Sequence, residues 1–453
     1  MENSARDNLL RSWKEIASYL GVDERTCARW EHTFSMPVHR AGEGSTKSHV
    51  FAYRDELDRW FRETFPVSGD RQAPGETPAA PPRRGFLRRT AVLAVMVVVV
   101  VAVFLAIKGM LPKTGAPGPP ADFHLRGTKL AVLDEFGKEL WVKDLHVEGL
   151  REEEDYRMCF QVASGMKGAE NLPWIAIKDI DGDGRNETLF AVKRKTDAYG
   201  EGILICFDSE GNEKWRFAAG REMTYQGRVC SADYRLLGFK LHDINGDGRQ
   251  EVFVVAFQYP WEPCQLAVLD SRGSLIGEFW NAGYFRDIVF ADLDGDGHEE
   301  LYAAGVNNEY GGGCVAVFDP ADVHGASPQG AGFSFAGLTG GSELYYLDFP
   351  RTDVSLADGA IVAGHVRLDV TSNKRIQVLS HMNLIYELGK GMRCLNVRGG
   401  HGFVRAYNRL KVQGKVRSTL DDAYYEAIRK NIRYWNGTAM TLEPSMNLKC
   451  PSP

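Results

Sequence analysis

An uncharged run of 18 residues, TAVLAVMVVVVVAVFLAI at positions 90–107, constrains this chain more than any other feature of its sequence. A helix rises 1.5 Å per residue, so the run alone would span about 27 Å, close to the ~30 Å hydrocarbon layer of a bilayer. Segments rich in proline and glycine flank it at 66–87 and 112–122, which argues against a buried helix of a folded core. The sequence therefore predicts one transmembrane helix over 88–111.

Basic residues on the two sides of the run predict its orientation. Four arginines precede it closely and two lysines follow it: Arg83, Arg84, Arg88 and Arg89, then Lys108 and Lys113. Since the more basic flank of a membrane helix faces the cytoplasm, we expect a cytoplasmic N-terminal part and a periplasmic or extracellular C-terminal part.

Composition and cysteine usage add two limits. A charged fraction of 25% and a hydrophobic fraction of 44% are those of ordinary globular domains. Of the eight cysteines, only Cys27 precedes the run; the other seven leave at least one unpaired, and no CxxC spacing suggests a metal. Cys206 and Cys314 lie in apolar, strand-like runs, so we expect them to be small core residues.

The N-terminal 65 residues have the pattern of a small unit of helices and a hairpin. Ser12 and Glu15 have the spacing of a capping box, which opens a short helix that Gly21 ends. The expected elements are a helix, a second helix, two strands and a third helix, at 12–20, 24–34, 36–40, 49–53 and 55–63.

This order resembles the winged helix-turn-helix of the MerR and excisionase families, on the segments SWKEIASYLGVDERTCARWE, VHR, HVFAY and DELDRW. In that family the second helix enters the DNA major groove and the wing touches the backbone. The resemblance implies groove contacts by Arg25, Thr26 and Arg29 and phosphate contacts by Arg40 and Lys47. Acidic and basic side chains are nearly balanced in 1–65, so a homodimer would help DNA binding, and a protein-interaction module stays open.

Three acidic segments, at 179–187, 243–251 and 292–300, share the pattern DxDGDGxxE, with Asn in place of the second Asp in the middle copy. Oxygen side chains at positions 1, 3, 5 and 9 are the hard ligands that calcium prefers, and position 7 would offer its carbonyl. The predicted ligands of about three Ca²⁺ ions are Asp179, Asp181, Asp183, Arg185, Glu187, Asp243, Asn245, Asp247, Arg249, Glu251, Asp292, Asp294, Asp296, His298 and Glu300.

An EF-hand is the main rival for this pattern, but it needs a glutamate at position 12, where the copies have Phe190, Val254 and Ala303. Strand-like segments flank the copies, and hairpins such as ILICFDSEGNEKW alternate with them. The loops resemble the FG-GAP and VCBS repeats of integrin α-chain propellers. The resemblance implies an all-β propeller of about five four-stranded blades, closed by RCLNV and FVRAYNRLKV. Whether the ions are structural or sensed stays open.

The segments give the following expected order: a winged helix-turn-helix domain (1–65), a linker (66–87), a transmembrane helix (88–111), a second linker (112–122), a propeller (123–415), and a C-terminal helix with a tail (416–453). No HExxH, GxSxG or GxxxxGK[ST] motif occurs, so we expect no enzyme.

The layout resembles that of ToxR-type one-component regulators. It implies a bacterial inner-membrane transcription regulator that binds DNA in the cytoplasm, and a ligand or protein through the external calcium-binding propeller. The alternative is an envelope adhesion or scaffold protein whose N-terminal unit binds a cytoplasmic protein and not DNA.

Overall fold

The computed structural model describes residues 9–10, 12–20, 27, 36–41, 49–64, 118–163, 172–195, 202–258, 262–330, 332–358, 367–371, 375–380 and 384–445. They belong to two compact units, Met1–Met110 and Leu111–Pro453. Each unit is described by itself.

The N-terminal unit combines a small antiparallel sheet with two helices. Its elements are β1 (Leu9–Leu10), α1 (Trp13–Leu20), β2 (His39–Ala41), β3 (His49–Tyr53) and α3 (Arg54–Thr64). The strands pair in the order β1-β3-β2. Ile16, Ala52 and Leu57 are fully buried between the helices and the sheet. The Ser12 hydroxyl accepts a hydrogen bond from the Glu15 amide at 3.2 Å, which supports the start predicted for α1.

The winged helix-turn-helix class is wrong for this unit. The hairpin β2–β3 carries a third strand, β1, so the described residues form a three-stranded sheet with two helices. The expected recognition helix, 24–34, lies outside the described residues apart from Cys27. Three of the predicted DNA contacts (Arg25, Thr26, Arg29) and Lys47 lie outside them as well, and Arg40 lies on β2.

The expected transmembrane helix, 88–111, also lies outside the described residues. Across the part of the chain that the structure describes, no helix has the length and apolar character needed to cross a membrane. The longest of these helices, α7 (His401–Val412), has 12 residues and measures about 18 Å, against the ~30 Å of the hydrocarbon layer. This finding contradicts the single-pass inner-membrane location expected from the sequence.

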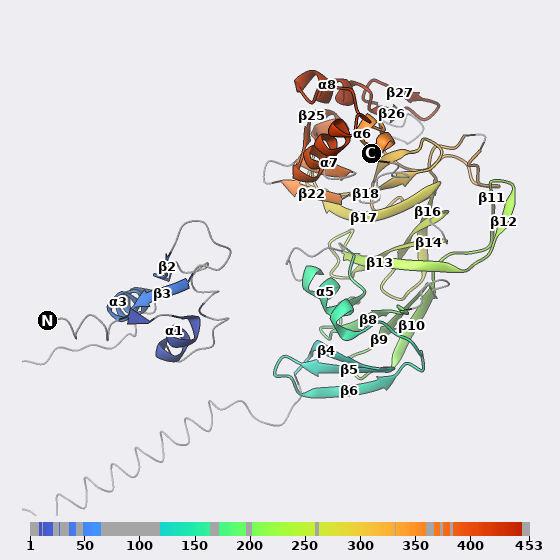
Figure 1. The fold of residues 1–453 in the computed structure, drawn as a ribbon. Helices are drawn as coiled ribbons and strands as arrows, with labels where there is room; N and C mark the ends of the chain where they lie inside the picture. Colours follow the sequence, from blue (N-terminus) through green and yellow to red (C-terminus); the bar gives the residue numbers. More distant parts are fainter. Residues whose placement is uncertain are drawn as a thin grey trace, which may run out of the picture. The chain divides into compact units, whose positions relative to one another are not determined.

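The C-terminal unit is mainly β (Figure 1). Its first sheets are β4 (Pro120–Arg126), β5 (Lys129–Asp134) and β6 (Glu139–Asp144); then β7 (Ile175–Lys178), β8 (Glu187–Ala191), β9 (Ile203–Phe207) and β10 (Glu213–Ala218); then the pair β11 (Met223–Tyr225) and β12 (Arg228–Cys230). A five-stranded sheet follows, with β13 (Tyr234–His242), β14 (Glu251–Gln258), β15 (Cys264–Leu269), β16 (Leu275–Asn281) and the parallel strand β20 (His324–Ala326).

The last two sheets belong to the second half of the unit. One has six strands in the order β17 (Gly283–Ala291), β18 (Glu300–Asn307), β19 (Gly312–Phe318), β21 (Tyr345–Phe349), β26 (Arg433–Trp435) and β27 (Met440–Thr441). The other holds β22 (Arg367–Thr371), β23 (Arg375–Ser380), β24 (Leu384–Leu388) and β25 (Cys394–Gly399). Besides α7, the helices are α5 (Glu153–Ala163), α6 (Asp353–Ala357), the short η3 (Lys390–Met392) and α8 (Asp422–Lys430).

Buried hydrophobic clusters join each sheet of this unit to the next. One cluster packs β4–β6 and α5 with β7–β10 and parts of β13–β16. A second packs β13–β16 with β17–β19, and a third packs β17–β21 with β22–β25, α7 and α8. The sheets therefore follow one another in chain order, from β4–β6 to the C-terminal helices (Figure 1).

The prediction of a propeller with about five four-stranded blades is wrong. The six sheets of this unit have between two and six strands, and no described ladder joins the first sheet to the last. The segment FVRAYNRLKV, expected to be a closing strand, lies in α7 and buries Phe403, Ala406, Tyr407 and Leu410. These positions have the i, i+3, i+4, i+7 spacing of one helix face, which explains why the segment is helical.

The six cysteines whose side chains are described are buried thiols: Cys27, Cys206, Cys230, Cys264, Cys314 and Cys394. Cys206 and Cys314 are fully buried in β9 and β19, which confirms their predicted role in the core. Burial raises the pKa of Cys264 to about 12, so this thiol stays neutral at physiological pH and acts as a packing group.

Candidate metal site

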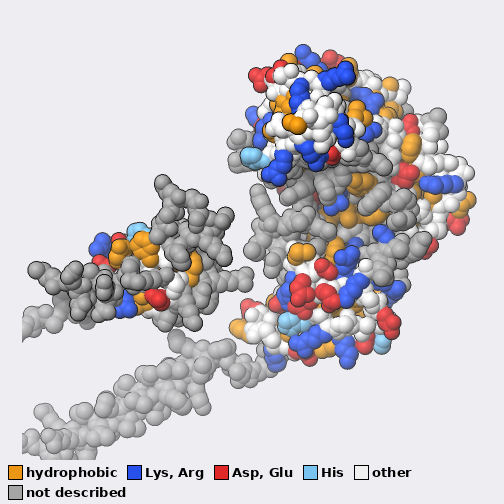
Figure 2. All heavy atoms as spheres, in the orientation of Figure 1, with side chains coloured by type: hydrophobic (Ala, Val, Ile, Leu, Met, Phe, Trp, Pro, Cys, Tyr) orange, Lys and Arg blue, Asp and Glu red, His pale blue; other side chains and the backbone are white. Residues whose placement is uncertain are grey.

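Each acidic segment forms a turn between two antiparallel strands of the C-terminal unit. We call 179–187, between β7 and β8, the first turn; 243–251, between β13 and β14, the second turn; and 292–300, between β17 and β18, the third turn. On the face drawn in Figure 2, acidic and basic side chains of this unit are interspersed, so surface charge alone does not mark the site.

The first aspartate of a turn organises its backbone. In the first turn, the two oxygens of Asp179 accept hydrogen bonds from the amides of Gly182 and Gly184, each at 2.8 Å. In the second turn, Asp243 accepts from the amides at the same two positions, also at 2.8 Å. Gly184 has a φ of 84°, a left-handed conformation that glycine adopts at little cost. The glycines therefore allow the side-chain oxygens to gather on one side.

The glutamate at position 9 closes each turn by accepting the amide of position 2. The pairs are Glu187 with Ile180 at 3.0 Å, Glu251 with Ile244 at 3.0 Å, and Glu300 with Leu293 at 3.5 Å. Desolvation by burial is the largest influence on these carboxyls and raises the pKa of each. A neighbouring cation would offset that desolvation and favour the ionised form.

Two of the turns bring three carboxylates each within reach of a single ion. Asp179, Asp181 and Glu187 each offer an oxygen, and these oxygens lie within 4.8 Å of one another; the same holds for Asp292, Asp294 and Asp296. Calcium binds oxygen at 2.3–2.6 Å, so two ligands of one ion lie up to about 5 Å apart. Both clusters could therefore hold a metal ion.

The other predicted ligands lie in the turns but are not all gathered. In the second turn, the Asn245 side chain accepts the amide of Asp247 at 3.0 Å and donates to its carboxylate at 3.3 Å. At position 7, the amides of Arg185, Arg249 and His298 donate to the aspartate at position 5 at 2.8 Å each. These three residues thus shape the turns with their amides.

A residue that the sequence did not single out contacts the first turn. Lys214, on β10, places its Nζ 2.5 Å from an oxygen of Asp181 and 3.1 Å from one of Glu187. The two carboxylates raise the pKa of Lys214 against the opposing effect of burial, so its charge is retained. β10 pairs with β9, which pairs with β8, where Glu187 is the first residue. Only this strand pairing brings Lys214 to the turn.

The three turns are neighbours. The Lys178 ammonium donates to the Gln250 side chain at 2.8 Å, and the Gln250 amide donates to the Ile180 carbonyl at 2.8 Å, which joins the first turn to the second. The His242 ring, next to the second turn, stacks on Phe290, next to the third, with 4.0 Å between ring centroids. Movement of one turn is therefore constrained by the next.

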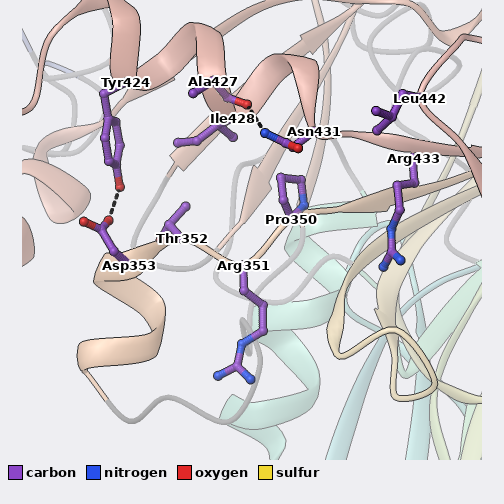
Figure 3. A pocket seen from close by; sticks show the side chains of 10 residues that line it. All are labelled: Pro350, Arg351, Thr352, Asp353, Tyr424, Ala427, Ile428, Asn431, Arg433 and Leu442. Atoms are coloured by element: carbon purple, nitrogen blue, oxygen red, sulfur yellow. Dashed lines mark hydrogen bonds between the residues drawn. The ribbon is translucent and has the colours of Figure 1, made fainter. Parts of the chain in front are cut away.

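A separate cavity of about 420 Å³ lies among α6, α8 and the β26–β27 strands, lined by Pro350, Arg351, Thr352, Asp353, Tyr424, Ala427, Ile428, Asn431, Arg433 and Leu442 (Figure 3). The Tyr424 hydroxyl donates to Asp353 at 2.6 Å, and the Asn431 side chain donates to the Ala427 carbonyl at 2.7 Å. These polar groups hydrogen-bond within the protein and hold the helices against the neighbouring segments, so they are not free to bind a ligand in the cavity. The acidic turns are the better candidate site.

No protein-family model matches the chain, and no curated protein matches it either. Among solved structures, it is similar to rhamnogalacturonan lyase YesW, with 14% identity, 48% of this chain and 40% of that chain covered, and a TM-score of 0.29. A Bacillus licheniformis rhamnogalacturonan lyase, PL11, gives the same identity and coverage with a TM-score of 0.28. The chain thus spans 40% of the length of these lyases, and a likeness at such a TM-score assigns neither a fold nor an activity.

Proposed function

We propose that the C-terminal unit is a calcium-binding module, not an enzyme, whose ions stabilise the acidic turns. The observation that carries the proposal is the third turn, where Asp292, Asp294 and Asp296 bring carboxylate oxygens within 4.8 Å of one another. No lysine or arginine of the described residues forms an ion pair with Asp294 or Asp296, so their repulsion is left for a bound cation to offset.

The donor chemistry favours calcium over other cations. All the candidate side-chain ligands are oxygen atoms. Zinc and copper prefer thiolate and imidazole ligands, so this donor set does not favour them. Calcium accepts 6–8 oxygen ligands in variable geometry, whereas magnesium requires a near-ideal octahedron and keeps most of its water. An irregular turn with several carboxylates suits the more permissive ion.

Calcium is expected to raise the melting temperature of the full chain relative to the chelator-treated protein. A ligand that binds only the folded state at 100 times its Kd adds about 2.7 kcal/mol per site, which for a unit of this size corresponds to a rise of roughly 4 °C per site. Scanning calorimetry in 5 mM EDTA and in stepwise calcium measures the rise. Magnesium at the same concentrations should give a smaller one.

The double variant Asp294→Asn, Asp296→Asn tests whether the third turn carries the effect. It should lose most of the third turn's share of the calcium-dependent rise. The matched control is Asp233→Asn, an exposed aspartate that accepts from the Ser231 hydroxyl outside the turns, which should keep the full rise. An identical melting temperature of the unaltered protein in calcium and in EDTA would contradict the proposal.

A further inference from the structure

The first turn already contains a cation. The Lys214 ammonium contacts Asp181 and Glu187, which are two of the three carboxylates that could hold a metal ion there. An ion bound by the same oxygens would occupy the region that the ammonium fills, because both need close contact with the same two groups. The turn therefore cannot hold both in this arrangement.

Burial strengthens the contact. The side chains of Lys214 and Asp181 are each 27% exposed, and that of Glu187 is 2% exposed. Charge-assisted hydrogen bonds in such partly desolvated places are stronger than exposed ion pairs. A metal ion would have to displace the ammonium, which would then have to be hydrated by solvent or to pair with another side chain. Asp183 is also engaged, since the Arg185 guanidinium donates to it at 3.1 Å.

The other turns lack this lysine. The hairpin after the second turn repeats the same local geometry: Ser274 donates its amide to Asp270 at 2.8 Å, as Asn212 does to Asp208 at 2.7 Å. Three residues beyond the hairpin glycine, however, Ile276 stands where Lys214 does, and a hydrocarbon side chain cannot neutralise a carboxylate.

At the third turn, Lys390 approaches the backbone and does not take the place of an ion. Lys390 donates to the main-chain carbonyl of Asp294 at 3.0 Å and leaves its carboxylate alone. Lys214 thus distinguishes the first turn from the third, although both turns gather three carboxylates.

We propose that Lys214 is the built-in cation of the first turn, so that this turn takes no calcium while the third turn does. The inference rests on the proposed function for the third turn. The proposed function concerns the carboxylates of the third turn, whereas this inference concerns Lys214 at the first turn. The number of bound calcium ions distinguishes failure of one from failure of the other. Lys214 thereby stabilises the conformation of the first turn without a metal ion.

The test is the number of calcium ions bound per full chain, from calorimetric titration and native mass spectrometry. Lys214→Met removes the charge and keeps the length of the side chain, so this variant should bind one more ion than the unaltered protein. Lys214→Arg keeps the charge and should leave the count unchanged. Lys143→Met, at an exposed lysine on β6, is the matched control and should also leave it unchanged.

A second variant keeps the test decisive should Lys214→Met fail to fold. In the unaltered protein, Asp181→Asn should leave the ion count unchanged, because the first turn binds none. A loss of one ion in Asp181→Asn, or a folded Lys214→Met with no added ion, would overturn the assignment of Lys214. If the unaltered protein binds no calcium, the proposed function fails, and a single ion gained by Lys214→Met would still support the inference.

Discussion

Arg433→Met is expected to lower the free energy of unfolding by about 3 kcal/mol at pH 8. The Arg433 guanidinium, on β26, donates two hydrogen bonds to one oxygen of Asp348, on β21, at 3.0 and 2.6 Å. The Asp348 side chain is 1% exposed, so methionine would leave a buried carboxylate with no opposite charge. The loss falls at the low end of the range for such pairs because the Arg433 side chain is 38% exposed.

The loss should also depend on pH. Burial raises the pKa of Asp348 from 3.8 to about 6, even though Arg433 opposes the shift. Between these values the folded chain holds a proton that the unfolded chain has released, so this group favours folding more as the pH falls from about 7 to 4. Without Arg433 the pKa rises further. The difference between Arg433→Met and the unaltered protein should therefore shrink from pH 8 to pH 5.

Urea denaturation at the two pH values measures both effects. Arg216→Met removes an exposed partner of Glu213 and serves as the control, with an expected loss below about 1 kcal/mol at either pH. The double variant Arg433→Met, Asp348→Asn should recover part of the stability, because it removes the uncompensated charge. An equal loss for Arg433→Met at pH 8 and pH 5 would show that packing, and not the charge of Asp348, causes it.

The acidic turns could be predicted from the sequence because their geometry is local. Asp179 binds amides three and five residues ahead, and Glu187 binds one seven residues back, so a short pattern specifies the whole turn. The flanking strands β13 and β14 follow from the same kind of signal, the apolar runs on both sides of the second turn. Lys214 could not be predicted, since its position depends on how β8, β9 and β10 pair.

The corrected features depended on distant parts of the chain. A blade count from the sequence requires each repeat to keep its own strands, but β26 joins the sheet of β21 from far along the chain, held there by the Arg433 and Asp348 pair. A repeat pattern does not encode such an addition. By contrast, Phe403, Ala406 and Tyr407 have the spacing of a helix face in the sequence itself, so α7 is predictable from local pattern alone.

Trp280→Ala is expected to lower the free energy of unfolding by about 3–5 kcal/mol, the usual range for removal of a buried tryptophan. Trp280 is the second-last residue of β16 and is fully buried, with its ring edge-to-face against Tyr234 at 5.6 Å between centroids. Trp280→Phe is the matched variant. It keeps most of the volume and removes an indole N–H that has no hydrogen-bond partner among the described residues, so its loss should stay below about 1.5 kcal/mol.

The loss in Trp280→Ala should be the same in calcium and in EDTA. The register places Trp280 opposite Gln265, and Gln265 opposite Ala256, which lies five residues along β14 from Glu251, or about 17 Å at the rise of a strand. Sites this far apart with no shared partners add within about 0.5 kcal/mol. Denaturation of both variants with and without calcium measures whether the effect of the substitution and the effect of calcium on the free energy of unfolding are additive. Should calcium restore the stability of Trp280→Ala beyond what it gives the unaltered protein, the turns and the core would be energetically coupled, and the ions would do more than hold the turns locally.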